Sequence, residues 1–380
     1  MDISLIQSYL NASNLDAWLI YDYHNINPVF GEVLGPHHAT RRTFLMVPAD
    51  GEPVLLLHYV DVGQFDDIQT SVYLDRTEMK EALQQMLSGR RRVALEYSPM
   101  GELPNTSYVD AGTMELIRSL GVTPVSSADL YQQVCARWTA EQLQLHRVAA
   151  AKLGLILDRV FAYLRANVGR ITEYDLQLFI QQEFAVEKLE APDGPVVAVN
   201  AHASDPHFAP SPEQSAVLDW GDWLLIDLWA REPEGVYADA TWVAHIGRDA
   251  TPEQRAVFAV VKGARDRAFA YLRQSFERGE TVQGWQVDAV ARDFITAQGY
   301  GPYFTHRLGH SLGTAVHGRA VNLDGFETRD TRRVIEGIGL TIEPGIYLPE
   351  FGVRSEIDVY MSPDGPVITT PLQEDIVLIG

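Results

Sequence analysis

The sequence predicts two domains of different fold class, an α/β domain followed by an α+β domain. Its 380 residues are enough for two domains of about 150 residues each. In the first part of the chain, short apolar runs alternate with helical patterns, which is typical of layered α/β folds. In the second part, helices and strands follow one another without a regular strand–helix–strand order, which indicates α+β.

The elements of the first part can be placed in order along the chain. Residues 2–14 have an amphipathic pattern that predicts a short helix. Residues 43–47 and 53–58 are apolar runs separated by the turn sequence P-A-D-G, which predicts a β-hairpin. Further strands are expected at 17–21, 71–74, 92–96 and 122–125, and helices at 77–87 and 110–120.

A long helix marks the beginning of the second part. Residues 140–167 keep a helical period without a proline, and Thr139 and Gln142 have the spacing of a capping box. We therefore expect an N-terminal domain at 1–138 and a second domain at 139–380. In the second domain, further helices are expected at 172–187, 252–277 and 284–298, and strands at 195–200, 223–229, 237–246, 340–343 and 353–361.

Charge and cysteine content exclude several classes of function. The chain has 51 acidic and 30 basic residues, a net charge of −21, which argues against nucleic-acid and anionic-membrane binding. The single cysteine, Cys135, excludes an intrachain disulfide and a thiolate zinc site. Since the N-terminus has no basic segment and no apolar run approaches about 18 residues, we expect a cytoplasmic protein.

Four carboxylates and one imidazole of the second part lie in apolar or glycine-rich sequence: Asp227, Asp239, His310, Glu343 and Glu356. Buried carboxylates are costly unless they are paired or bind metal. Two divalent cations would neutralise four carboxylates, and this ligand set suits Mn²⁺, Co²⁺, Fe²⁺ or Zn²⁺. Taken singly, each acid is more readily explained by a helix cap or an arginine partner, but this explanation does not suit the set as a whole.

Histidines are concentrated near one of these residues. The chain has 11 histidines, so a window of 12 residues would hold about 0.35 by chance, yet residues 306–317 hold His306, His310 and His317. Histidines gathered in a glycine-rich loop favour a site in which imidazole binds metal or moves protons. His207, in the sequence S-D-P-H-F, is a fourth candidate.

The second part resembles the catalytic domain of the M24 metallopeptidases, which have the pita-bread fold. Five stretches in the family's order carry the resemblance: G-D-W-L-L-I-D, Y-A-D-A-T, H-R-L-G-H-S-L-G-T-A-V-H, T-I-E-P-G-I-Y and G-V-R-S-E. The group includes Xaa-Pro aminopeptidase (aminopeptidase P), Xaa-Pro dipeptidase (prolidase) and methionine aminopeptidase. The first 138 residues are similar in strand–helix order to the N-terminal domain of the creatinase/prolidase branch.

The resemblance implies a dinuclear metal centre. Asp227 would chelate a first ion, Asp239 and Glu356 would bridge two ions, and His310 and Glu343 would hold the second. The pair would be manganese in the first instance, with zinc, cobalt or iron as alternatives. A hydroxide shared by the two ions would attack the scissile carbonyl, and Glu343 would take the proton of the water.

The resemblance also implies roles on the substrate side. His317 would stabilise the oxyanion, His207 would lie near the scissile peptide, and His306 would line the same site. Arg354 matches an arginine of the prolidase and aminopeptidase P branch. Thr241 would hydrogen-bond a metal-bound carboxylate from behind.

The implied activity is removal of the N-terminal residue from peptides with proline in second position, by a homodimer. Methionine aminopeptidase is disfavoured because it lacks so large an N-terminal domain, and a metal-free creatinase-like hydrolase because all five ligand positions are present. The motifs do not separate a dipeptidase from an aminopeptidase. An M24 peptidase without a proline requirement and a catalytically silent peptide-binding module are the alternatives.

Three residues depart from the family's pattern close to these motifs. Trp229 stands where a glycine is common, Trp242 replaces a usual arginine, and Gly318 follows His317 where a glutamate is frequent. None of them removes a proposed ligand. We therefore expect any effect of these residues to be on substrate preference.

Overall fold

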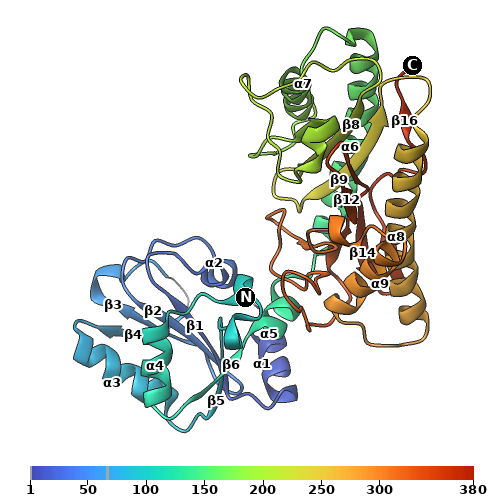
Figure 1. The fold of residues 1–380 in the computed structure, drawn as a ribbon. Helices are drawn as coiled ribbons and strands as arrows, with labels where there is room; N and C mark the ends of the chain where they lie inside the picture. Colours follow the sequence, from blue (N-terminus) through green and yellow to red (C-terminus); the bar gives the residue numbers. More distant parts are fainter. Residues whose placement is uncertain (1, 66–67) are drawn as a thin grey trace. The chain divides into compact units, whose positions relative to one another are not determined.

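The computed structural model describes residues 2–65 and 68–380, which divide into two units, Met1–Arg137 and Trp138–Gly380 (Figure 1). The first unit contains a six-stranded sheet in the order β4-β3-β2-β1-β5-β6. Its strands are β1 (Ala17–Asp22), β2 (Thr43–Pro48), β3 (Val54–His58), β4 (Gln69–Tyr73), β5 (Arg92–Leu95) and β6 (Thr123–Ser126). The antiparallel pairing of β2 with β3 confirms the predicted hairpin.

Helices cover both faces of this sheet, so the side chains of β1 pack alternately into two apolar clusters. Trp18 and Ile20 pack in the cluster that includes α1 (Ile3–Ala12), α2 (Pro28–Leu34) and α5 (Ala128–Val134). Leu19 and Tyr21 pack in the other, with α3 (Arg76–Leu87) and α4 (Ala111–Ser119). Successive side chains of a strand point to opposite faces, so a strand that is apolar throughout lies between two helical layers. The α/β class predicted for this part is confirmed.

The second unit is built from two four-stranded sheets and a short hairpin. One sheet has the order β16-β9-β8-β7 and the other the order β10-β11-β14-β15. Their strands are β7 (Val196–Val199), β8 (Trp223–Ala230), β9 (Ala238–His245), β10 (Ser311–Leu312), β11 (Gly339–Ile342), β14 (Ile357–Ser362), β15 (Gly365–Ile368) and β16 (Val377–Leu378). The hairpin joins β12 (Gly345–Tyr347) and β13 (Gly352–Arg354).

The four long helices of the second unit pack against these strands or against one another. α6 (Ala140–Asn167) and α7 (Glu173–Val186) contribute to the apolar cluster that also holds β7, β8 and β9. α8 (Pro252–Glu277) and α9 (Gly284–Ala297) pack against each other, and α8 contacts β11 and β15 (Figure 1). The predicted capping box of Thr139 and Gln142 begins α6, so this prediction is confirmed.

The prediction of one strand over residues 353–361 is wrong. The structure has β13 and β14 instead, separated by Ser355 and Glu356. Ser355 donates its backbone N–H to Pro344, and Glu356 donates to Thr241 of β9, so the chain changes pairing partner at this point. Apolar periodicity does not report a change of partner. The break places Glu356 between the two sheets.

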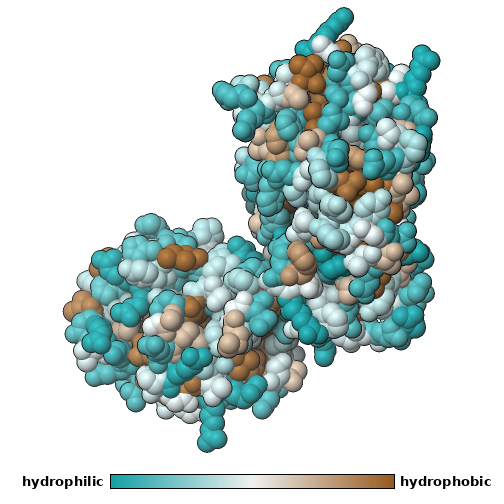
Figure 2. All heavy atoms as spheres, viewed as in Figure 1, coloured by the Kyte–Doolittle hydropathy of each residue, from teal (hydrophilic) through white to brown (hydrophobic). Residues whose placement is uncertain are grey.

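Short helices were also missing from the prediction. α2 and α5 have seven residues each, too few for a helical period to be distinct in sequence. Hydrophobic residues form small separate groups on the face drawn in Figure 2, and no helix in the described part of the chain is long and apolar enough to span a bilayer.

Candidate metal centre and substrate cavity

The register of β8 and β9 brings the two aspartates onto one face of their sheet. Asp227 on β8 lies opposite Thr241 on β9, and Trp229 lies opposite Asp239. Paired residues of antiparallel strands share a face, as do residues two apart on one strand. These four side chains therefore point to the same side. The other sheet contributes the rest of the centre.

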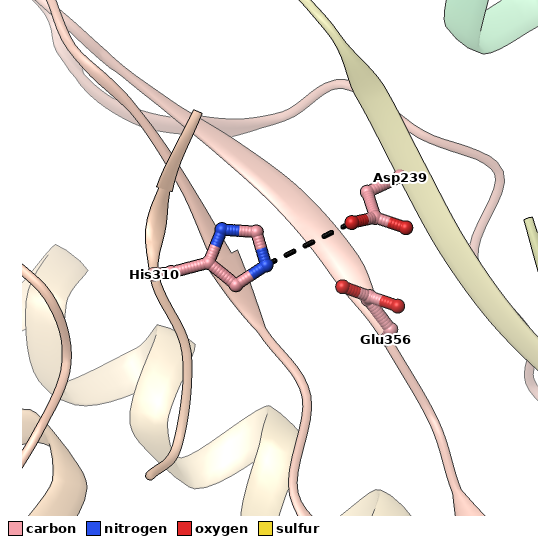
Figure 3. A group of neighbouring side chains, drawn as sticks. All are labelled: Asp239, His310 and Glu356. Carbon is pink, nitrogen blue, oxygen red and sulfur yellow. Dashed lines mark ion pairs between the residues drawn. The ribbon is translucent and has the colours of Figure 1, made fainter. Parts of the chain in front are cut away.

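Asp239, His310 and Glu356 meet at the junction of the two sheets (Figure 3). One possible ligand atom of each lies within 4.8 Å of the others, and all three residues are buried. His310 Nε2 is 3.7 Å from Asp239 Oδ2 and 3.3 Å from Glu343 Oε1. Three of the four proposed carboxylate ligands are thus gathered around the imidazole.

The loop before β10 holds His310 in the tautomer that a metal ligand needs. His310 Nδ1 lies 3.1 Å from the carbonyl oxygen of Ser311, so Nδ1 carries the proton and Nε2 is free. Thr341 Oγ1 accepts the backbone N–H of His310 and donates to Glu343 Oε1. A Cβ at Gly309 would lie 2.1 Å from the Thr341 carbonyl oxygen, so this close approach requires glycine.

Asp227, the fifth proposed ligand, has an arginine partner. Arg354 Nη2 lies 2.6 Å from Asp227 Oδ2, and the arginine side chain is buried. Arg354 also donates to Thr241 Oγ1 and to the Tyr347 hydroxyl. Thr241 in turn donates its hydroxyl to Glu356 Oε2 at 2.7 Å. The expected contact of Thr241 with a candidate ligand is therefore present.

Burial and repulsion between neighbouring carboxylates raise the pKa values of three of the proposed ligands. The pKa of Asp239 is raised well above its usual value by burial, then by the neighbouring Asp227 and Asp358 carboxylates. Burial likewise raises the pKa of Glu356, with Asp239 as the next cause, and raises the pKa of Glu343 to about 7. Burial lowers the pKa of His310. A cation among these groups would favour their metal-binding forms.

Partnerless oxygen atoms give a test of whether these residues fit metal ions. Asp227 Oδ1, Asp239 Oδ1 and Glu356 Oε1 are buried and lack a hydrogen-bond partner in the described part of the chain. A buried carboxylate oxygen without a partner is costly. Oxygen atoms with free lone pairs next to a free imidazole nitrogen fit divalent cations that prefer oxygen and nitrogen ligands. The residues therefore fit divalent metal ions.

The candidate ligands line a cavity of about 850 Å³. The four residues expected on the substrate side also line it: His207, His306, His317 and Arg354. The rings of His310 and His317 are 4.4 Å apart, centre to centre. His306 Nδ1 lies 2.6 Å from the Arg307 carbonyl oxygen and its Nε2 lies 2.7 Å from the Tyr347 hydroxyl. Burial lowers the pKa of His306 to about 3, so this ring is neutral at pH 7.

Residues that sequence reasoning missed complete the surroundings. Tyr347 links His306 to Arg354 through its hydroxyl, and it belongs to the quoted stretch T-I-E-P-G-I-Y, although it received no role. Asp358 is fully buried and accepts the backbone N–H of Asp239 at 2.9 Å. Arg307 lines the cavity next to His306. No spacing rule would have singled out Asp358, because its contact with Asp239 joins β14 of one sheet to β9 of the other.

The three departures from the family's pattern have different positions. Trp229 lines the cavity. Trp242 instead packs against the apolar cluster of α6, α7 and their strands, with its ring 6.3 Å from that of Phe161. A Cβ at Gly318 would lie 2.9 Å from the Ser311 carbonyl oxygen, so the glycine allows tight packing on β10. Only Trp229, of these three, is placed to touch a substrate in the cavity.

Comparisons with known proteins agree with this geometry. The model of metallopeptidase family M24 matches residues 144–363. A probable dipeptidase PepE from Mycobacterium bovis is 26% identical over 89% of this chain and 86% of its own length. An Xaa-Pro dipeptidase from Lactobacillus helveticus is 26% identical over 100% of this chain and 99% of its own. The crystal structure of dipeptidase PepE from Mycobacterium ulcerans superposes with a TM-score of 0.78 at 24% identity, covering 99% of this chain and 96% of that one.

Proposed function

We propose that this chain, which belongs to metallopeptidase family M24, is an Xaa-Pro dipeptidase with two divalent metal ions in its active site. The family and the pita-bread fold make it a metallopeptidase with dipeptidase relatives. The observation that carries the proposal is the group of Asp239, His310 and Glu356 in the cavity wall, with buried carboxylate oxygens that have no partner among the described residues. The Lactobacillus relative, similar along the whole chain, supports the preference for proline.

Five residues would hold the ions: Asp227, Asp239, His310, Glu343 and Glu356. When bound, a pair of divalent cations supplies Lewis acidity and lowers the pKa of water at the site. Manganese is our first expectation, and zinc, cobalt and iron suit the same ligands. Arg354 keeps the Asp227 carboxylate in place from the side, because its guanidinium also contacts Thr241 and Tyr347.

The chain's own groups would move the protons of the reaction. Thr341 donates its hydroxyl to Glu343 Oε1, which orients the carboxylate. Glu343 would take a proton from water through Oε2 and deliver it to the leaving nitrogen. His317 would donate to the oxygen of the scissile carbonyl as negative charge develops there, and His207 would bind near the scissile peptide. His306, neutral and held by Tyr347, would line the substrate side.

Metal content and product analysis test this proposal together. The protein is expressed with ample Mn²⁺, its metals are counted by elemental analysis, and Ala-Pro, Ala-Pro-Ala and Ala-Ala are offered as substrates. We expect two ions per chain and cleavage of Ala-Pro, with both lost in Asp239→Ala and kept in Asp364→Ala, an exposed acid.

Each other outcome has a definite meaning. Release of alanine from Ala-Pro-Ala would indicate an aminopeptidase P instead, and cleavage of Ala-Ala alone would remove the preference for proline. A chain that binds no metal and cleaves none of these peptides would be a silent peptide-binding module. We also propose a cytoplasmic homodimer; the single cysteine agrees with a reducing compartment, and light scattering on the purified protein measures the assembly.

A further inference from the structure

Trp229 lines the cavity beside the proposed metal ligands, and the mechanism above does not use it. Its ring and Val316 pack against a small buried cluster of Trp138, Val236, Tyr237, Leu312 and Tyr360. Side chains packed in this way have little freedom to move aside. The indole is therefore a fixed part of the cavity wall.

The sheet register places this wall next to two proposed ligands. Trp229 pairs directly with Asp239 on the neighbouring strand and is two residues from Asp227 on its own. Directly opposed residues of an antiparallel pair have Cβ atoms about 4.5–5.5 Å apart. Among the described apolar residues that line the cavity, Trp229 is the one with two proposed ligands as neighbours in the sheet.

The chemistry of a peptide substrate fixes which of its side chains meets this wall. The α carbon of the first residue is bonded both to the amino nitrogen and to the scissile carbonyl carbon. The carbonyl has to reach the ligand cluster, and the cationic amine is attracted to the carboxylates there. The first side chain therefore begins beside Asp227 and Asp239, where Trp229 stands. The second residue leads away from the cluster.

We propose that Trp229 forms the wall of the pocket for the first side chain of the substrate and restricts that residue to small side chains such as glycine, alanine and serine. This inference rests on the dipeptidase function proposed above. A leucine or phenylalanine in first position would overlap the indole, which the cluster behind it prevents from moving. The preference would come from exclusion of large side chains.

The indole N–H of Trp229 allows a steric role of the ring to be distinguished from a role in hydrogen bonding. Trp229 Nε1 is buried and has no partner among residues 2–65 and 68–380. A wall made only of ring surface does not need that group. Trp229→Phe should keep the preference for small first residues, whereas Trp229→Ala should remove it.

The first measurement is kcat/KM for Gly-Pro, Ala-Pro, Leu-Pro and Phe-Pro with Mn²⁺-loaded protein. We expect the ratio of Leu-Pro to Ala-Pro to rise at least about tenfold in Trp229→Ala, the scale at which a hydrophobic pocket distinguishes side chains. Trp242→Phe is the matched control, because Trp242 also has a buried Nε1 without a partner in the part of the chain that the structure describes, but it packs against the apolar cluster of α6 and α7 and does not line the cavity. Its ratio should equal that of the wild type.

Equilibrium binding gives a second readout that needs no turnover. Non-cleavable dipeptide analogues with a reduced peptide bond and alanine or leucine in first position are titrated calorimetrically into each protein. Trp229→Ala should bind the leucine analogue more tightly than the wild type does. If Trp229→Ala does not fold, as judged by thermal melting, Trp229→Leu carries the same test with an apolar side chain retained next to Val316.

Two results would overturn the inference: a wild type that prefers leucine or phenylalanine first, or variants of Trp229 with the wild-type ratio in both readouts. Failure of the proposed function looks different. In that case neither wild type nor variants cleave any of the dipeptides, while the binding titrations still decide whether Trp229 limits the first side chain.

Discussion

Glu96, a carboxyl group buried in the N-terminal unit, makes the stability of that unit depend on pH. It follows β5 and is 1% exposed. Its oxygens accept hydrogen bonds from Trp18 Nε1 at 2.7 Å, Asn27 Nδ2 at 3.0 Å and Ser127 Oγ at 3.0 Å. Burial nevertheless raises the pKa of Glu96 from 4.5 to about 7, although these three hydrogen bonds act to lower it.

The sign and size of the effect follow from linkage. The unfolded chain releases this proton near pH 4.5, whereas the folded chain keeps it up to about pH 7. The free energy of unfolding therefore decreases as the pH rises from 4.5 to about 7. At higher pH, Glu96 is ionised in both the folded and the unfolded chain, so it adds no further dependence on pH. Since one pKa unit corresponds to about 1.36 kcal/mol, the total decrease is about 3 kcal/mol.

Glu96→Gln should remove this slope. Its absolute stability is a poorer test, because the new amide would face Asn27 Nδ2, which is also a donor, at a cost of about 1–3 kcal/mol. The measurement is urea unfolding between pH 5 and pH 8, followed through hydrogen exchange of the N-terminal unit.

The indole N–H of Trp18 offers a direct probe by NMR. It is the one tryptophan before residue 138, so Trp18→Phe identifies its resonance. The wild-type signal should titrate near pH 7 and the Glu96→Gln signal should not. A Trp18 resonance that does not move with pH, together with equal slopes in the two proteins, would refute the reasoning.

Three further predictions concern the metal centre. Asp239→Asn should raise the melting temperature of the metal-free protein, because it relieves repulsion between carboxylates. It should also abolish the stabilisation by Mn²⁺, which in the wild type is about 2.7 kcal/mol when the Mn²⁺ concentration is 100 times the dissociation constant. A metal-free variant that melts below the wild type would contradict this. Arg354→Met leaves the Asp227 carboxylate without its partner and should cost about 3–5 kcal/mol in urea unfolding of the metal-free protein, so a loss under 1 kcal/mol would show that the pair is dispensable. Thr241→Val removes the hydrogen bond to Glu356 Oε2 and should weaken Mn²⁺ binding about 10–100-fold in calorimetric titration, which unchanged affinity would disprove.

The elements that the sequence predicted best are those whose pattern is local. α6 and its capping box depend on residues within one helix, and the hairpin of β2 and β3 depends on two runs and the turn between them. The break between β13 and β14 was missed because it depends on which distant strands pair with each half. β10 and β16, with two residues each, have no period to detect.

In the candidate site, too, the features that depend on local sequence were predicted and those that depend on distant segments were not. Asp227, Asp239, Glu343 and Glu356 were found because a charged residue in an apolar run is visible in sequence. Their shared cavity was not visible, and neither was the ion pair between Asp227 and Arg354, although Arg354 itself was singled out. Arg354 lies 127 residues from Asp227 in the chain, so no local pattern could indicate this pair. The roles of these residues as ligands stay predictions.

The position of the cluster between two sheets gives its carboxylates a structural consequence. Asp227 and Asp239 belong to one sheet, while His310, Glu343 and Glu356 belong to loops and strand ends of the other. Without a cation, repulsion among the acids opposes the close approach of the two sheets, whereas the hydrogen bonds from Thr241 Oγ1 to Glu356 Oε2 and from the Asp239 backbone N–H to Asp358 Oδ2 hold the sheets together. Cations bound there would join the sheets as well as serve the reaction. Metal affinity and stability of the second unit should therefore change together, because the same oxygen atoms determine both.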